Sequence, residues 1–279
     1  MTKASAIPVS IKRFGDKGCV EVIDVVTVEE PLEIRLGFGP EKQREQRSLS
    51  ITMRTPGHDL ELVLGFLFTE GIIQNMDDIF HLEHCTDKKG ERSENIVRAE
   101  IKPEISLDWG RFQRHFYTNS SCGICGKASI ESLEQMCFTP VHSEVKVDSA
   151  IISSLNAKMR EAQGVFEHTG GLHAAAIFNK KGDLIFLRED IGRHNALDKV
   201  IGAAFFKKII PLQDHIVMLS GRSCFELIQK SIAATIPFVV SVGAPSSLAI
   251  ETASKFGITL IGFTKAQSFN VYTHSERIL

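Results

Sequence analysis

Apolar and polar side chains alternate with a period of two in several stretches of the first hundred residues. The alternation is clearest in residues 31–38, 47–55 and 97–101, and this period is typical of half-buried strands. One helical pattern interrupts it over residues 58–71, where a glycine marks the end of the helix. We therefore expect residues 1–115 to form a smaller, strand-rich N-terminal region of α+β type.

The second half of the chain has a different pattern. An apolar stripe with helical spacing predicts a helix over residues 148–163, capped by Asp148. After a hairpin, helices alternate with strands that are apolar throughout, at residues 215–220, 237–243 and 258–263. Apolar strands between helices are typical of a parallel sheet covered on both faces. Residues 116–279 are therefore predicted to form one α/β domain.

A short turn follows each of these apolar strands, at residues 220–223, 243–247 and 263–268. In open parallel sheets, ligands bind outside the carboxyl ends of the strands. The first two turns lead into helix N-termini, where free backbone N–H groups attract phosphate. Gly221 permits a close approach of the backbone, and Arg222 supplies charge. Ordinary βα turns have the same composition, so the turns alone leave the phosphate site and the plain turn both open.

The composition of the 279-residue chain favours neither nucleic acid nor a membrane as a partner. Apolar residues make up 43% and charged residues 24%, with a net charge of −2, so no global field attracts nucleic acid or an anionic surface. The first residues lack a signal-peptide pattern, and no stretch approaches the roughly 18 apolar residues of a spanning helix. We therefore expect a cytoplasmic protein whose six cysteines are mostly reduced.

Cys122 and Cys125 form a CxxC pair within residues 120–129, SSCGICGKAS. A structural zinc site needs two further ligands, and the sequence has no second CxxC and no HxxxH. The zinc-site signature of nucleobase deaminases is H-x-E followed by P-C-x-x-C. This chain has HLE at 81–83, but Ser121 occupies the proline position. A thioredoxin-like dithiol normally lies early in a small domain, whereas this pair lies mid-chain. We expect no metal at the pair and no bound zinc elsewhere in the protein.

The residues around the pair are mostly small and polar, which favours an exposed loop over two buried cysteines. Lys127 and a helix start, expected at residues 127–136, lower the pKa of a thiol in such a loop. A thiolate of this kind attacks a sulfur–sulfur bond and takes up its terminal sulfur. A second thiol three residues away can resolve, shield or relay that sulfur.

Six long blocks, among them FYTNSSCGICGKASIE and REDIGRHNALDKVIG, cover most of the chain: residues 53–73, 116–131, 168–178, 188–202, 219–249 and 257–274. In these blocks the chain resembles the FdhD/NarQ family, the formate dehydrogenase accessory sulfurtransferases. The resemblance implies a cytidine-deaminase-like fold without zinc, a three-layer arrangement with helices on both faces of a sheet. It also implies transfer of persulfide sulfur from a cysteine desulfurase to the molybdenum bis(molybdopterin guanine dinucleotide) cofactor of formate dehydrogenase, by a homodimer.

The resemblance assigns roles to individual residues. The persulfide carrier corresponds to Cys122, with Cys125 in support. The cofactor-binding stretch corresponds to Phe263, Thr264, Lys265, Ala266, Gln267 and Ser268. Relatives commonly carry arginine and glycine in this stretch, so the contacts to phosphate or guanine are expected to differ here. A pyrophosphate bound to it would reach the neighbouring turn at Gly221 and Arg222.

Four further side chains are either acid–base groups or structural ones, namely a helix cap and hydrogen-bonded histidines. They are His168, His173, Asp190 and His194. We assign none of them to catalysis. Two other classes of function also stay open. A zinc-dependent, deaminase-like hydrolase would need Glu83 near its metal. A non-catalytic cofactor chaperone would bind the dinucleotide and tolerate the loss of Cys122.

Overall fold

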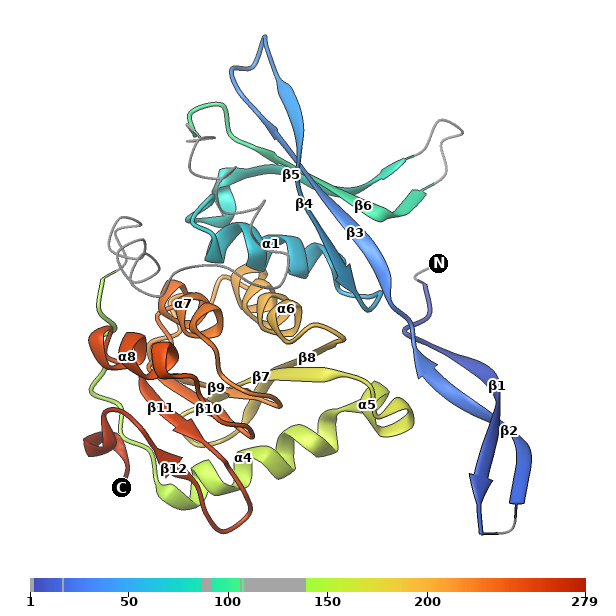
Figure 1. Ribbon diagram of the computed structural model, residues 1–279. Coiled ribbons are helices and arrows are strands. Elements are labelled where there is room, and N and C mark those ends of the chain that lie inside the picture. Colours follow the sequence, from blue (N-terminus) through green and yellow to red (C-terminus); the bar gives the residue numbers. More distant parts are fainter. Residues whose placement is uncertain (1–2, 17, 87–91, 106, 108–138) are drawn as a thin grey trace.

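The structure is a computed structural model that describes residues 3–16, 18–86, 92–105, 107 and 139–279. These residues form three sheets, of two, four and six strands, and helices lie on and between the two larger ones (Figure 1). Within the described ranges, no helix is long and apolar enough to cross a membrane.

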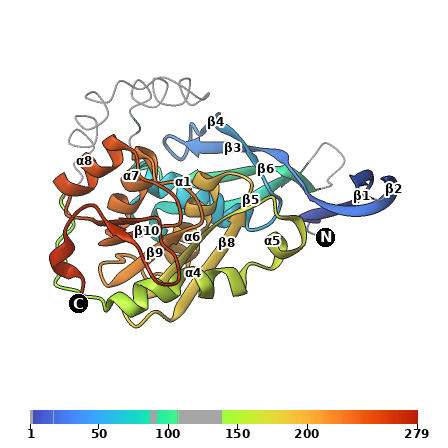
Figure 2. The ribbon, with the colours of Figure 1, turned by 60° about the horizontal axis from the view of Figure 1, so that its bottom comes forward.

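The two-stranded sheet is an N-terminal ribbon that projects away from the rest of the molecule (Figures 1 and 2). Strands β1 (Ala6–Gly15) and β2 (Gly18–Thr27) pair antiparallel along their whole length. Several of its apolar side chains are exposed to solvent, among them Phe14 and Ile23. The ribbon therefore exposes more apolar side-chain surface to solvent than is usual.

The four-stranded sheet has the order β4-β3-β6-β5. Its strands are β3 (Glu30–Phe38), β4 (Glu45–Arg54), β5 (Ile79–Thr86) and β6 (Arg92–Ile101). The alternating positions Leu32, Ile34 and Leu36 are buried in one core with helix α1 (Asp59–Thr69). A 3₁₀ turn, η1 (Met76–Asp78), leads into β5. The period-two pattern thus predicted the strands correctly at 31–38, 47–55 and 97–101.

The six-stranded sheet has the order β12-β11-β10-β9-β7-β8. Its strands are β7 (His173–Asn179), β8 (Leu184–Asp190), β9 (His215–Leu219), β10 (Phe238–Ser241), β11 (Thr259–Gly262) and β12 (Asn270–Val271). The three predicted apolar strands β9, β10 and β11 are parallel. Antiparallel pairing of β7 with β9 and of β12 with β11 makes the whole sheet mixed rather than parallel.

Helices cover both faces of this sheet, as the apolar strands predicted (Figure 2). They are α4 (Ser149–Ala162), α5 (Gly164–Thr169), α6 (Arg193–Phe206), α7 (Phe225–Ala233), α8 (Ser247–Lys255) and the short η2 (Ser275–Arg277). One core contains side chains of α6, α7 and α8, and the core on the opposite face contains those of α4. The α4 helix begins as predicted, because Asp148 accepts a hydrogen bond from the Ala150 N–H at 2.7 Å. This α/β layering agrees with the expected fold class, whereas the more specific cytidine-deaminase-like assignment stays a prediction.

Helices α1 and α6 join the two larger sheets at a crossing where glycines replace side chains. A Cβ atom on Gly202 would lie 1.8 Å from the carbonyl oxygen of Glu61, and one on Gly65 would lie 1.9 Å from that of Asp198. The backbones therefore touch, and no larger residue fits without separating the helices. Phe205 of α6 belongs to the core beneath the four-stranded sheet, whereas most buried residues of α6 belong to a core of the six-stranded sheet, so this helix packs in both.

An ion pair crosses the same boundary between Arg188 of β8 and Glu61 of α1, with Nε 2.5 Å from Oε2. Burial tends to raise the pKa of Glu61, but hydrogen bonds from Arg188 and His58 outweigh it and lower that pKa to about 2. The carboxylate therefore stays charged at neutral and mildly acidic pH. The predicted domain boundary at 115/116 and the helix at 127–136 lie outside the described residues.

Candidate functional site

The turns after β9, β10 and β11 meet at one edge of the six-stranded sheet, as the parallel strands predicted. Backbone hydrogen bonds connect them in series: Gly243 N–H donates to the Gly221 carbonyl at 3.0 Å, and Phe263 N–H donates to the Gly243 carbonyl at 3.2 Å. Ser223 and Pro245 form a further bridge between the first two turns. The structure thus brings residues 220–223, 243–247 and 263–268 together into one continuous surface.

Two of these turns open into helix N-termini, where unpaired N–H groups and the helix dipole favour an anion. At α8, the side chain of Ser246 already accepts the N–H of Ala249. At α7, the N-cap residue Cys224 makes no capping hydrogen bond through its side chain. The side chains of Arg222 and Lys265 are exposed beside these turns. Backbone donors and two cations therefore lie along the same edge.

Two buried hydroxyl groups at this edge have no hydrogen-bond partner in the described part of the chain. They belong to Ser223 and Thr264, each 1% exposed. A buried hydroxyl without a partner costs about 1–3 kcal/mol, so a water molecule or ligand atom that reached either group would stabilise these turns. Phe263, beside Thr264, has a left-handed backbone with φ 53° and a half-exposed ring, a strained conformation typical of functional turns.

A histidine, a cysteine and a glutamate lie at the same end of the sheet. His194 is in the first turn of α6, Cys224 is the N-cap of α7, and Glu226 follows in the first turn of α7. The Nε2 atom of His194 lies 3.2 Å from the sulfur of Cys224 and 4.0 Å from Oε2 of Glu226. Of these three residues, only His194 was a candidate functional residue from the sequence. Cys224 and Glu226 had no local signal, because 30 residues separate the histidine from the cysteine.

Burial controls the protonation of this group. Burial, followed by the charges of Arg193 and Lys230, lowers the pKa of His194 to about 4, so its imidazole is neutral near pH 7. Burial and then the hydrogen bond with Glu226 raise the pKa of the Cys224 thiol. Burial tends to raise the pKa of Glu226 as well, but Cys224 and His194 hold it below its usual value. The thiol therefore holds its proton and the carboxylate is charged.

The other histidines considered from the sequence have different settings. His173, at the start of β7, has Nδ1 3.5 Å from the hydroxyl of Ser220, and burial followed by the charge of Arg193 lowers its pKa. His173 therefore belongs to the same sheet edge. His168 is exposed near the end of α5, and the structure gives it no link to the turns.

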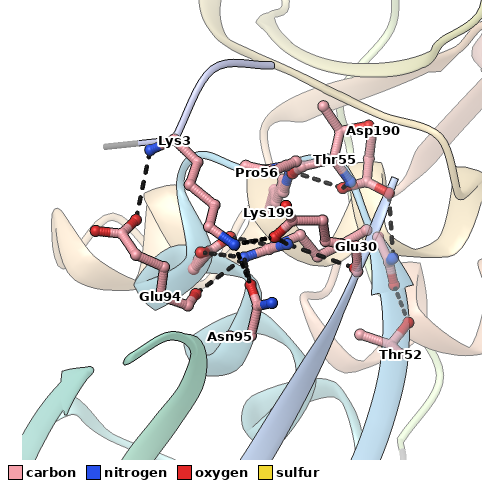
Figure 3. A network of polar contacts seen from close by, with 12 residues as sticks. Lys3, Glu30, Thr52, Thr55, Pro56, Glu94, Asn95, Asp190 and Lys199 are labelled. Carbon is pink, nitrogen blue, oxygen red and sulfur yellow. Dashed lines mark hydrogen bonds and ion pairs between the residues drawn. The ribbon is translucent and has the colours of Figure 1, made fainter. Parts of the chain in front are cut away.

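Asp190 has a structural role, as the helix-cap interpretation of this residue predicted (Figure 3). One carboxylate oxygen accepts the Gly192 N–H at 2.8 Å and so caps the turn before α6. The other accepts the Thr55 N–H at 3.1 Å and lies 2.7 Å from Nζ of Lys199. Asp190 is fully buried, and these contacts hold α6 and β8 against the segment after β4.

The deaminase-like HLE sequence lies in the middle of strand β5. His81 and Glu83 pair with each other at 3.0 Å between Nε2 and Oε2. The deaminase signature places its glutamate at a helix start, so this strand position does not support the zinc-hydrolase alternative. Cys122 and Cys125 lie outside the described residues, and their roles stay predictions.

Comparison with known proteins gives consistent results. A model of the FdhD/NarQ family matches residues 28–279. The chain is 42% identical over 263 residues to the sulfur carrier protein FdhD of Mycolicibacterium paratuberculosis, covering 91% of this chain and 92% of that protein. It is 42% identical over 275 residues to the protein of the same name from Saccharolobus solfataricus, covering 97% and 99% of the two chains.

A solved structure shares the fold. It is a formate dehydrogenase accessory protein from Desulfotalea psychrophila, with a TM-score of 0.74 and 24% sequence identity. The match covers 99% of this chain and 100% of that one. The family match over nine-tenths of the sequence and the relatives at about 40% identity give one conclusion: the chain is a member of the FdhD/NarQ family.

Proposed function

We propose that this protein is a sulfurtransferase that carries sulfur as a persulfide on Cys122. The observation that carries the proposal is the group of relatives, about 40% identical over nine-tenths of the chain, that are named sulfur carrier proteins. A cysteine desulfurase donates the sulfur: the Cys122 thiolate attacks the terminal sulfur of the donor persulfide, and the donor leaves as a thiolate. Cys125 supports the carrier by shielding or relaying that sulfur.

The acceptor in this proposal is the molybdenum bis(molybdopterin guanine dinucleotide) cofactor, bound as a substrate during the maturation of formate dehydrogenase. Its guanine dinucleotide end would lie on the sheet edge formed by residues 220–223, 243–247 and 263–268. Three features support this placement: the α7 and α8 N-termini, the exposed cations Arg222 and Lys265, and the buried hydroxyls without partners. Phosphate groups satisfy all three kinds of donor.

GDP should bind this edge at least tenfold more tightly than guanosine, as measured by calorimetric titration of the full chain. Each well-aligned hydrogen bond from a charged or backbone donor to phosphate contributes about 1.5–3 kcal/mol, and guanosine lacks these bonds. Replacing Arg222 and Lys265 together with alanine should remove most of the difference. The matched control replaces Lys180 and Lys181, which are exposed at the opposite end of the sheet, and should leave it unchanged. Equal affinity for GDP and guanosine would place the phosphates elsewhere.

The proposal also includes a homodimer, with the N-terminal ribbon as part of the contact between copies. Phe14 and Ile23 lie on one face of the ribbon and are 77% and 69% exposed, which is a high exposure for large apolar side chains. Light scattering should give a dimer for the full chain, and Phe14→Ser with Ile23→Ser should shift it towards the monomer. Arg13→Ser, at an exposed position on the opposite face of the same ribbon, is the control. A dimer that persists in the apolar variant would exclude the ribbon as its contact.

A further inference from the structure

The side chains of His194, Cys224 and Glu226 direct three different metal-ligating atoms at one point. The imidazole nitrogen, the thiol sulfur and a carboxylate oxygen all lie within 4.8 Å of one another. Two helices hold them: α6 supplies the histidine, and the first turn of α7 supplies the other two. The histidine and cysteine are partly buried, and the glutamate is exposed, so the group is open to solvent on one side.

Each of the three side chains offers a lone pair that a metal ion can accept. The thiol proton is shared with the Glu226 carboxylate, and the role of the His194 Nε2 atom depends on its tautomer. In the tautomer with its proton on Nδ1, Nε2 is an acceptor. A cation placed between the three ligand atoms would then contact a nitrogen, a sulfur and an oxygen.

We propose that His194, Cys224 and Glu226 bind one zinc ion, with the fourth position open to water or a small ligand. Sulfur, nitrogen and oxygen ligands together suit zinc rather than magnesium or calcium. In a tetrahedral zinc site with ordinary bond lengths, the nitrogen and sulfur ligands are about 3.6 Å apart, and nitrogen and oxygen about 3.4 Å apart. The distances here are 3.2 and 4.0 Å, and all three ligand atoms lie within 4.8 Å of one another, so side-chain shifts of up to about 1 Å would complete the geometry.

The charges around the group are compatible with this ion. Zinc binding displaces the proton of Cys224, and the two negative charges of thiolate and carboxylate then balance the two positive charges of the metal. Two cations act on the group, Arg193 and Lys230. Lys230 is already paired with Asp198 at 3.0 Å and Glu70 at 3.3 Å, whereas Arg193 acts on the group directly. Because the zinc complex has no net charge, the surrounding cations repel it only weakly.

This proposal departs from the sequence-based expectation of no metal in the protein. The site is separate from the cysteine pair at 122 and 125. It has three protein ligands, whereas a structural zinc site has four. It also does not depend on the proposed sulfur transfer, because none of its ligands is the persulfide carrier. Failure of one proposal would leave the other intact.

The test titrates zinc and cobalt(II) into the full chain carrying Cys122→Ser and Cys125→Ser, which removes the other cysteine pair as a binding site. One equivalent of zinc should bind, and cobalt(II) should give a thiolate-to-metal charge-transfer band. Cys224→Ser should remove the band and weaken zinc binding at least tenfold. His194→Gln should weaken binding to a similar degree. Cys85→Ser, at a partly buried thiol on β5, is the matched control and should change neither readout.

Two results would overturn the proposal. One is the absence of zinc binding at micromolar concentrations in a background chain that melts like the wild type. The other is zinc binding that survives both Cys224→Ser and His194→Gln, because the metal would then have other ligands. The two substitutions lie on different helices, so a folding defect in one variant leaves the other to decide.

Discussion

Cys122→Ala is expected to abolish both sulfur uptake and the activation of formate dehydrogenase. The physical reason is that only a thiolate can attack the donor's sulfur–sulfur bond and retain the terminal sulfur, and alanine has no nucleophile. After incubation with a cysteine desulfurase and cysteine, intact mass spectrometry should find the wild-type chain heavier by one sulfur atom. Dithiothreitol should remove this added mass. The variant should show no adduct under the same conditions.

The control for this experiment is Cys19→Ala, which removes an exposed cysteine on the N-terminal ribbon. This variant should keep the adduct and the maturation activity, because its thiol has no role in the proposed transfer. Cys125→Ala should fall between the two if its thiol shields or relays the sulfur. Full maturation activity in Cys122→Ala would refute the sulfurtransferase proposal and favour a cofactor chaperone.

The sheet edge could be predicted from the sequence because its determinants are local. Strands that are apolar throughout, such as β9 and β10, must be buried on both faces, and helices between them enforce parallel pairing. Parallel pairing then places every carboxyl end at one edge. The meeting of residues 220–223 with 243–247 and 263–268 followed from that rule, and the backbone hydrogen bonds confirm it.

Other features needed contacts between distant residues. The group of His194, Cys224 and Glu226 exists because the strand order places β9 beside β7 and so brings the start of α7 close to the start of α6. Neither residue type nor spacing carries that information. Similarly, the short strand β12 has only two residues, too few for a period-two pattern. Its antiparallel pairing with β11 was therefore not predicted.

The HLE sequence shows that a local match to a motif has no function unless the fold places it correctly. Its histidine and glutamate occupy alternate positions of β5, so they lie on the same face of a strand and pair with each other. A motif acquires its chemistry from the element that holds it. Here that element is a strand of the four-stranded sheet.

A buried ion pair holds the N-terminal part of the chain to the large sheet. Nζ of Lys199 on α6 lies 2.7 Å from Asp190 and donates to the Thr55 carbonyl at 2.8 Å (Figure 3). Both charged side chains are at most 1% exposed. Thr55 directly follows β4, whereas Asp190 ends β8. The pair therefore contributes to the positions of the first turn of α6 and of the candidate site beside it.

Lys199→Met should destabilise the protein by about 3–5 kcal/mol, because it leaves the Asp190 carboxylate buried without a counter-charge. That loss is a large part of the roughly 5–15 kcal/mol that stabilises a typical domain, and urea unfolding followed by circular dichroism should detect it. Lys3→Met breaks a partly exposed pair with Glu30 and should cost less than about 1 kcal/mol. Adding Asp190→Asn to Lys199→Met should recover part of the loss, since the uncompensated charge is then gone. Equal small losses for Lys199→Met and Lys3→Met would mean that the buried pair contributes no more to the fold than an exposed one.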